Sequence, residues 1–180
     1  MSEYDLAQFC ADCREALGAD PGPGGRERVR RNLERLLANP DFIAAHVPVP
    51  SKTGRTVLHH DPKTGFYVMA HGTPEGNRRG KPHDHGASWA VYGQARGVTE
   101  MTVWKRTDAG AEPGRAELEP ERRFTLEPGR AALFDTGTIH NTAHPMPAAW
   151  VRVTGTDLDR IERYRYDPAA RTMERMGAEA

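Results

Sequence analysis

Three histidines give this chain of 180 residues its clearest chemical signal. His83 and His85 stand two positions apart in the segment PHDHG, and His140 ends the segment DTGTIH. Alternate side chains of a β-strand point to the same face, so we expect the two neighbouring imidazoles to project together while Asp84 points away. Imidazole suits iron, nickel, copper and zinc, and three protein ligands leave positions open for water, substrate or dioxygen. The spacing therefore predicts a reactive metal site; the alternative is a surface pair in a proline-rich turn.

The residues around these histidines resemble the two sequence motifs of the cupin superfamily. After His85, four residues lead to Ala90 and six more lead to Gly97. The second motif is spaced as Gly129, five residues, Asp135, one residue, Gly137, two residues, His140, three residues and His144. The resemblance covers roughly residues 80 to 145. It implies a mostly β fold, the double-stranded β-helix or small jelly-roll barrel, with a metal on histidines of two facing strands.

Departures from the cupin pattern narrow the expected ligand set. Ala90 stands where the usual pattern has a metal-binding glutamate, so the resemblance implies a metal held by the three histidines without a carboxylate. Asp135 replaces the usual proline and His144 replaces the usual asparagine. Neither of these two changes removes a metal ligand.

A cupin that lacks the glutamate, begins with a helical segment and carries HDHG followed by W-x-x-x-G resembles the thiol dioxygenases. That family includes cysteine dioxygenase and the bacterial 3-mercaptopropionate dioxygenases. The resemblance implies Fe(II) as the cofactor, sulfur and dioxygen both bound at the iron, and a sulfinate product. We therefore expect a mononuclear non-haem iron dioxygenase whose partners are a small organic thiol and O2.

The same resemblance bears on the substrate. Arg55 stands, with a one-residue gap, near the place of the arginine that anchors the substrate carboxylate in cysteine dioxygenase. The cysteine of that enzyme's thioether crosslink would fall at Ala90, which excludes the crosslink here. The family's serine, histidine and tyrosine would fall at Val153, Gly155 and Asp157, so the polar triad is missing. A mercapto acid or a larger thiol is therefore expected in preference to cysteine.

The alternation of side chains along the strands, and closeness to the residues named above, add further candidates for the site. If no bulge follows the histidine pair, Trp89 faces the same side and lines the site, although ordinary core packing is compatible with that place. Beyond His140, either two valines or the alternate pair of Arg152 and Thr154 face inward. The valines are the usual core choice, whereas an inward arginine would anchor an anion. The candidates for catalysis are Arg55, Trp89 and Tyr164, and those for substrate binding are Arg55, His59, Trp89, Arg152 and Tyr166.

Three of these candidates have strong alternatives. Tyr164 and Tyr166 could reach over the barrel mouth and replace the missing tyrosine, but packing along a sheet edge is favoured. His59 and its neighbour His60 lie near Arg55 and could contact substrate, whereas a surface turn before Asp61 suits at least one of them.

Composition excludes several kinds of partner. Lys plus Arg and Asp plus Glu both number 25, so the zero net charge gives no field that favours nucleic acid or an anionic membrane. No stretch approaches the roughly 20 apolar residues of a membrane span, and the N-terminus lacks the basic and apolar regions of a signal peptide. Two cysteines agree with a reducing compartment. We therefore expect a cytoplasmic protein.

The periodicity of apolar residues divides the chain in two. Residues 1–45 are expected to form a helical segment packed on the barrel, with helices from about 6 to 17 and 26 to 38 and a short one after Asn39. Cys10 and Cys13 share the first helix's apolar face, which favours core packing over redox or zinc chemistry. Residues 46–180 are expected to form the barrel and a C-terminal hairpin about residues 167 and 168. Strands are predicted at 56–58, 66–70, 88–92, 98–104, 122–126, 131–134 and 149–153.

Other functions are compatible with the same motifs. They are a cupin oxygenase of a non-thiol chelating substrate, a metal-dependent isomerase or hydrolase, and a cupin that binds a small ligand without turnover. Edge strands or the arginine-rich second helix could support a homodimer.

Overall fold

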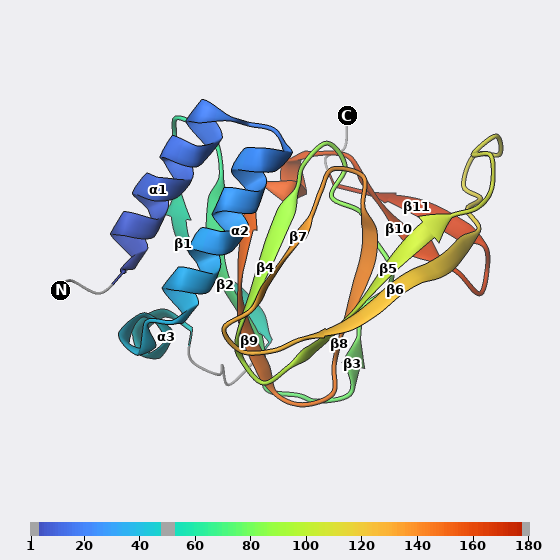
Figure 1. Ribbon diagram of the computed structural model, residues 1–180. Helices are drawn as coiled ribbons and strands as arrows, with labels where there is room; N and C mark the ends of the chain where they lie inside the picture. Colours follow the sequence, from blue (N-terminus) through green and yellow to red (C-terminus); the bar gives the residue numbers. More distant parts are fainter. Residues whose placement is uncertain (1–3, 48–52, 178–180) are drawn as a thin grey trace.

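Two antiparallel β-sheets face each other, and helices cover the outer face of one of them (Figure 1). The computed structural model describes residues 4–47 and 53–177. The helices are α1 (Leu6–Ala19), α2 (Pro23–Leu37) and α3 (Pro40–His46). The five-stranded sheet has the order β1 (Gly54–His60), β2 (Tyr67–Thr73), β9 (Ala148–Thr154), β4 (Ala90–Arg96) and β7 (Ala131–Phe134). The four-stranded sheet has the order β3 (Arg78–Arg79), β8 (Ile139–His144), β5 (Thr99–Arg106) and β6 (Leu118–Leu126).

The strand order defines a jelly roll. Four strands of one sheet, β2-β9-β4-β7, face β3-β8-β5-β6 of the other, and the chain crosses between the sheets after β2, β3, β4, β6, β7 and β8. All pairings within the two sheets are antiparallel. This is the double-sheet arrangement in which two Greek keys wrap around each other. The predicted fold class, a mostly β jelly-roll barrel with an N-terminal helical segment, is confirmed.

Side-chain caps begin α1 and α3. Asp5 accepts a hydrogen bond from the Gln8 N–H at 2.8 Å, and Asn39 accepts from the Asp41 and Phe42 N–H groups at the start of α3. Ser2 and Asp5 are spaced in the sequence as a variant of the capping box, but Ser2 lies outside the described residues. The predicted start of α2 was three residues late, because Pro23 occupies the first turn, where its missing N–H costs nothing.

The largest core lies between the helices and the five-stranded sheet, outside the barrel. Cys10 and Cys13 are free and buried in it, so the prediction of core packing for this pair is confirmed. The other buried residues of this helix–sheet core include Phe9, Leu17, Val29, Leu33, Leu36, Leu37, Phe42, Phe66, Val68, Trp89, Val91, Val151 and Val153. A smaller core fills the barrel itself, from Ala90, Tyr92, Met101, Val103, Leu126 and Phe134.

The hairpin before β2 also ties the first helix to the barrel. Asp61 begins the predicted turn and accepts hydrogen bonds from the Lys63 and Thr64 N–H groups. Arg14 of α1 donates to the same buried carboxylate. Burial alone would raise the pKa of Asp61, but these donors outweigh it and lower the pKa to about 2. The carboxylate therefore stays charged and holds helix and hairpin together.

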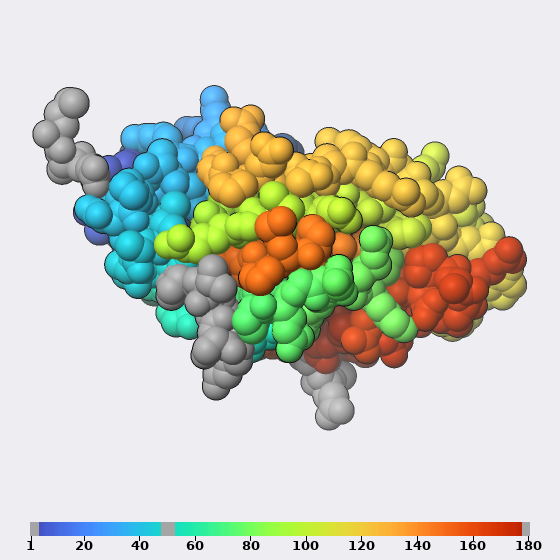
Figure 2. Space-filling model, turned by 90° about the horizontal axis from the view of Figure 1, so that it is seen from below, coloured from blue at the N-terminus to red at the C-terminus, as the bar shows by residue number. Residues whose placement is uncertain are grey.

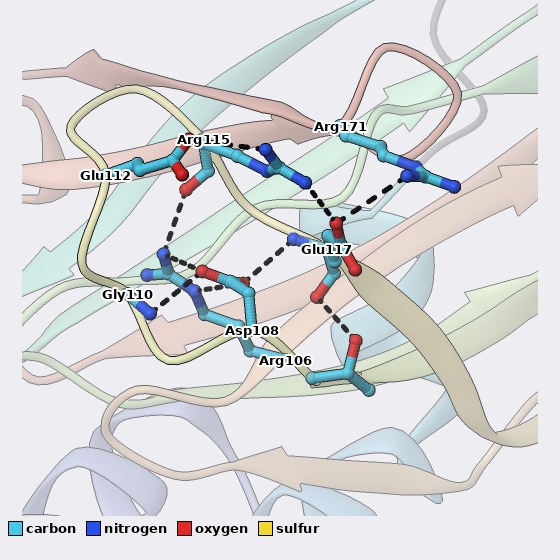
Figure 3. Close-up of polar contacts among 8 residues, drawn as sticks. Arg106, Asp108, Gly110, Glu112, Arg115, Glu117 and Arg171 are labelled. Atoms are coloured by element: carbon cyan, nitrogen blue, oxygen red, sulfur yellow. Dashed lines mark hydrogen bonds and ion pairs between the residues drawn. The ribbon is translucent and has the colours of Figure 1, made fainter.

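A network of ion pairs orders the long connection between β5 and β6 (Figure 3). Arg106 forms two hydrogen bonds with Asp108, which also accepts from two backbone N–H groups of the loop. The Arg106 guanidinium, with those N–H groups, holds the pKa of Asp108 below its usual range. At the far end, Arg115 and Arg171 both pair with Glu117. This polar loop is therefore held together by its own ion pairs and hydrogen bonds.

The chain ends in a hairpin that packs beside the four-stranded sheet. A short 3-10 turn (Leu158–Arg160) precedes β10 (Arg163–Asp167) and β11 (Thr172–Met176), which pair with each other. The predicted hairpin around residues 167 and 168 is confirmed. Strands β3 and β8 are the two that the sequence pattern did not mark. No helix within residues 4–47 or 53–177 is long and apolar enough to cross a membrane.

Gly93 sets the distance between α2 and the sheet. A Cβ at this position of β4 would lie 2.7 Å from side-chain carbons of Leu33 and Leu37, well inside van der Waals contact. We expect Gly93→Ala to lower the free energy of unfolding by about 1–3 kcal/mol, because both leucines are locked in a packed core. Denaturant unfolding monitored by circular dichroism measures this loss.

Gly54 provides the matched control on the exposed edge strand β1. A Cβ there would meet no atom within 4 Å. Gly54→Ala should change the free energy of unfolding by less than about 0.5 kcal/mol. Equal effects of the two substitutions would contradict the close packing inferred at Gly93.

Candidate metal centre

The structure brings the three predicted histidines together inside one end of the barrel. His83 and His140 lie directly opposite each other, and each backbone N–H donates to the other's carbonyl at 2.9 Å. His85 precedes a tight turn that its carbonyl closes by accepting from the Ser88 N–H at 3.0 Å. One ligand atom from each ring lies within 4.8 Å of the others. This spacing is compatible with three ligands around one metal ion.

The surroundings of the rings fit a metal ion. His140 and His85 are 0 % and 1 % exposed, and His83 is half-buried. Nε2 of His140 and Nδ1 of His85 are buried without a hydrogen-bond partner, a costly state that a bound cation would relieve. Nδ1 of His83 contacts the Lys81 carbonyl at 3.1 Å, which leaves its Nε2 for the metal.

The protonation state of the rings also favours coordination. Burial lowers the pKa of His85 and of His140 well below the usual value, and the neighbouring histidines and Arg152 lower it further. Burial likewise lowers the pKa of His83. All three imidazoles are therefore neutral at pH 7, and the neutral ring is the form that binds a metal.

Asp84 fixes the backbone between the two neighbouring ligands. As predicted, it points away from the site, but it is buried rather than solvated. Its carboxylate accepts from the Gly86 N–H at 2.9 Å, the Tyr164 N–H at 3.1 Å and the Tyr166 hydroxyl at 2.7 Å. The C-terminal hairpin thus holds the histidine loop in place through this one carboxylate.

Aromatic side chains line the inner wall behind the histidines. The Phe134 ring stacks on His140 with ring centroids 4.0 Å apart, and Tyr92 meets the same ring edge-on at 5.5 Å. The Tyr92 hydroxyl lies 3.4 Å from Nε2 of His85. Ala90, at the position of the usual cupin glutamate, faces this interior. Among the described residues, the histidine cluster contains no carboxylate.

Arg152 places a positive charge beside the cluster. It lies opposite Tyr92 in the pairing of β9 with β4, so it faces the barrel interior, and Val151 and Val153 face the helices. Its Nε is buried without a hydrogen-bond partner, and its closest polar contact is a long one to the Met69 sulfur at 3.8 Å. Within the described ranges no carboxylate lies within 4.0 Å of its guanidinium. This geometry is suited to binding an anion.

The predicted place of Trp89 was wrong. The histidines are not part of a continuous strand: β4 begins only at Ala90, after a turn in which Gly86 has a φ of 56°. The turn breaks the alternation by one residue, so Ala90 faces the barrel and Trp89 packs in the helix–sheet core. Trp89 therefore does not line the metal centre.

Arg55 and His59 also lie away from the cluster. Arg55 sits on the edge strand β1 with its guanidinium paired to Asp159, about half exposed. His59 lies next to Phe66 of the helix–sheet core, with Nε2 3.9 Å from Asp61. The five-stranded sheet separates it from the histidines. Of the predicted substrate residues, Arg152 is the one that faces the metal centre.

The two tyrosines pack along the hairpin. Tyr166 is buried and bonds to Asp84, whereas the Tyr164 hydroxyl donates to Glu162 at the surface. Neither hydroxyl contacts a histidine of the cluster. Both tyrosines therefore pack along the hairpin, which was the favoured alternative. Tyr92 and Phe134 were missed by sequence reasoning. Counting alternate residues from Ala90, the glutamate position of the cupin motif, would have found Tyr92.

The fold and the histidine cluster together define a jelly-roll barrel with a candidate metal centre. No protein-family model and no curated protein matches the chain. Solved structures similar to it include KdgF from Halomonas sp., at TM-score 0.44 and 16 % identity, covering 59 % of this chain and 81 % of that one. The DMSP lyase DddQ from Ruegeria pomeroyi DSS-3 has TM-score 0.45 and 15 % identity, covering 72 % of this chain and 56 % of that one.

A cupin superfamily protein from Desulfitobacterium hafniense DCB-2 is similar at TM-score 0.42 and 11 % identity, covering 59 % of this chain and 80 % of that one. Each of these is a similarity of fold, and the activities named for those proteins are theirs.

Removing a ligand should remove the metal. After Fe(II) or Co(II) loading and desalting, we expect His140→Ala and His83→Ala to lose at least about 90 % of the bound metal. The reason is that the two remaining histidines would hold the ion much more weakly than three. His144→Ala is the matched control, because its ring stacks on Trp150 and bonds to Thr99 outside the cluster. Elemental analysis gives the metal content. Equal loss at His144 would mean that the third ligand is misassigned.

We expect Tyr166→Phe to weaken metal binding, although Tyr166 does not contact the histidines. The substitution leaves the buried Asp84 with one donor fewer, which costs about 1–3 kcal/mol of stability and lowers metal affinity about tenfold. Tyr164→Phe removes a hydroxyl from the same hairpin but only an exposed hydrogen bond to Glu162. Competition with a chromophoric chelator compares the two. A larger loss of metal affinity in Tyr164→Phe would contradict the role given to Asp84.

Proposed function

We propose that this protein is a mononuclear non-haem iron dioxygenase that oxidises the sulfur of a small organic thiol to a sulfinate. One observation supports this most: three neutral histidines without a carboxylate lie beside Arg152, a cation without a carboxylate partner among the described residues. The ligand set matches the resemblance to thiol dioxygenases at the motifs around His83 and His140. The arginine adds a place for an anionic substrate group.

The reaction adds both atoms of dioxygen to one sulfur. In balance, RSH + O2 gives RSO2H: the sulfur loses four electrons and dioxygen gains four, so no further reductant is needed. Fe(II) held by His83, His85 and His140 would supply the open coordination positions and the redox chemistry for this transfer. The remaining work of binding, orienting and excluding water falls to the residues of this chain.

Arg152 gives the substrate its orientation. A guanidinium binds a carboxylate through two parallel N–H···O bonds, and such bonds are strong where water is excluded. With its carboxylate held by Arg152, a mercapto acid would direct its thiol toward the histidine cluster. Phe134 and Tyr92 lie on the same sheet as Arg152 and add aromatic surface to this wall, and the Tyr92 hydroxyl near His85 is the donor best placed to bond a group at the centre.

The surroundings favour a mercapto acid over cysteine. Val153, at the place of the family's serine, points into the helix–sheet core instead of the barrel. The wall described here offers Arg152, Tyr92, Phe134 and Met69, and none of these carries a negative charge to pair with a protonated amine. An ammonium beside Arg152 would also be repelled by its charge.

Oxygen uptake with matched thiols tests this function. With Fe(II)-loaded protein we expect thiol-dependent O2 consumption and a sulfinate product, seen by mass spectrometry, with 3-mercaptopropionate used more efficiently than cysteine. Arg152→Gln should raise KM for 3-mercaptopropionate about tenfold or more, since a charged hydrogen bond is lost, and should change KM for the uncharged thiol 2-mercaptoethanol little. Arg55→Gln is the control, because its charge is already paired with Asp159.

Three results would overturn the proposal. Stoichiometric iron without thiol-dependent O2 uptake would favour a cupin that binds a small ligand without turnover. Turnover under strict anaerobiosis, with zinc or manganese in place of iron, would favour a metal-dependent isomerase or hydrolase. Uptake with a chelating non-thiol substrate would favour the oxygenase alternative.

A further inference from the structure

A second pocket lies at the end of the barrel that the histidine cluster does not occupy. Its volume is about 370 Å³, within the roughly 300–1,000 Å³ range of small-molecule sites. It opens between the β1–β2 edge and the β3–β8 edge, and Figure 2 views the molecule from the side of β3. The described lining residues are Thr53, Gly54, Arg55, His71, Gly72, Thr73, Arg78, Gly80, Thr142, His144 and Trp150. None of them belongs to the histidine cluster.

The charges around this second pocket favour an anion. Its described lining contains two arginines and no aspartate or glutamate. Arg55 is paired with Asp159, whereas no carboxylate within the described ranges lies within 4.0 Å of Arg78. The next residue, Arg79, belongs to the opposite face of β3 and pairs with Glu100 at 3.9 Å. Arg78 is therefore the cation at the rim that is left for a ligand.

The floor of the pocket offers a rigid, largely apolar surface. The Trp150 ring is stacked with His71 at a centroid distance of 5.5 Å and with His144 at 4.5 Å, both nearly parallel. Burial, with the charge of Arg152, lowers the pKa of His71 to about 2, and burial with the charge of Arg78 lowers that of His144 to about 4. Both imidazoles are therefore neutral at pH 7 and add no charge to the floor.

One polar atom in the floor lacks a partner. Nε2 of His71 is buried and makes no hydrogen bond in the described structure. Buried polar atoms are normally satisfied, and an unsatisfied one beside a pocket is a place for a ligand's polar group. Together with Arg78 at the rim, it gives the pocket two polar points separated by apolar surface.

We propose that this pocket binds a small organic carboxylate, with the anionic group at Arg78 and the apolar body against Trp150. The pocket does not share Arg152 or the three histidines with the metal centre, so the inference does not depend on thiol oxidation. It lies close to that centre, because Trp150 and Arg152 alternate along β9 with both side chains facing the barrel interior.

Benzoate tests the site directly, with benzamide as a neutral compound of the same shape. The chain has three tryptophans, so a spectrum of the indole N–H groups gives three signals, and Trp150→Phe assigns the one at this floor. We expect benzoate to shift the Trp150 signal saturably and to bind at least tenfold more tightly than benzamide. Acetate, which has the charge without the ring, should bind at least tenfold more weakly than benzoate.

Two arginine variants locate the anion. Arg78→Gln should weaken benzoate binding about tenfold, as expected for a lost charged hydrogen bond, and Arg79→Gln should leave it unchanged. Both residues are exposed, so both variants are expected to fold. Isothermal titration at fixed salt measures the affinities.

Variants of the metal centre separate this site from the proposed active site. Benzoate binding should persist in His83→Ala and in Arg152→Gln. Loss of binding in Arg152→Gln, with binding kept in Arg78→Gln, would place the anion at the metal centre and overturn the inference. Equal affinity for benzoate and benzamide, or no shift of the Trp150 signal, would overturn it as well. None of these three results would test oxygen uptake with thiols, so they leave the proposed function to be judged by its own experiment.

Discussion

The candidate metal centre depends on one buried carboxylate. Asp84 stands between two of the histidines, and a buried carboxylate is tolerated only when its oxygens are hydrogen-bonded. Here the donors are a backbone N–H of its own turn and two groups of β10, the Tyr164 N–H and the Tyr166 hydroxyl. The same residue's N–H donates to the Tyr164 carbonyl at 3.1 Å. Satisfying Asp84 therefore fixes the direction of His83 and His85 and makes the C-terminal hairpin part of the site.

The location of the main core explains the rest of the interior. Helices α1 and α2 bury the outer face of the five-stranded sheet, so the apolar residues of β9, Val151 and Val153, point outward to them. The inner face is then free for polar groups, and Arg152, His71 and Trp150 lie along it. A barrel that had to supply the protein's only core would have less apolar packing left to offset the desolvation cost of a buried arginine. Because the helices form the main core on the outer face of the sheet, polar side chains can occupy the inner face of the barrel.

Several parts of this arrangement could be predicted from the sequence. The fold class followed from the resemblance of the two histidine motifs to the cupin superfamily, and both long helices followed from apolar periodicity. Strand β8 was not predicted because His140, Thr142 and His144 give its inner face a polar pattern, which hides the alternation expected of a half-buried strand. Trp89 was misplaced because one glycine turn shifts the parity, and a shift of one residue exchanges the two faces.

The sequence by itself determined the ligand types, their spacing, the absence of a glutamate at position 90 and the presence of a helical segment before the barrel. These are properties of neighbouring residues, and local spacing is sufficient to encode them. Only the tertiary structure decided which arginine faces the metal centre. Arg55 and Arg152 both lie on strands of the five-stranded sheet, but Arg55 meets Asp159 at the edge whereas Arg152 is enclosed without a carboxylate partner among the described residues. That difference depends on which charges the fold brings close together from distant parts of the chain.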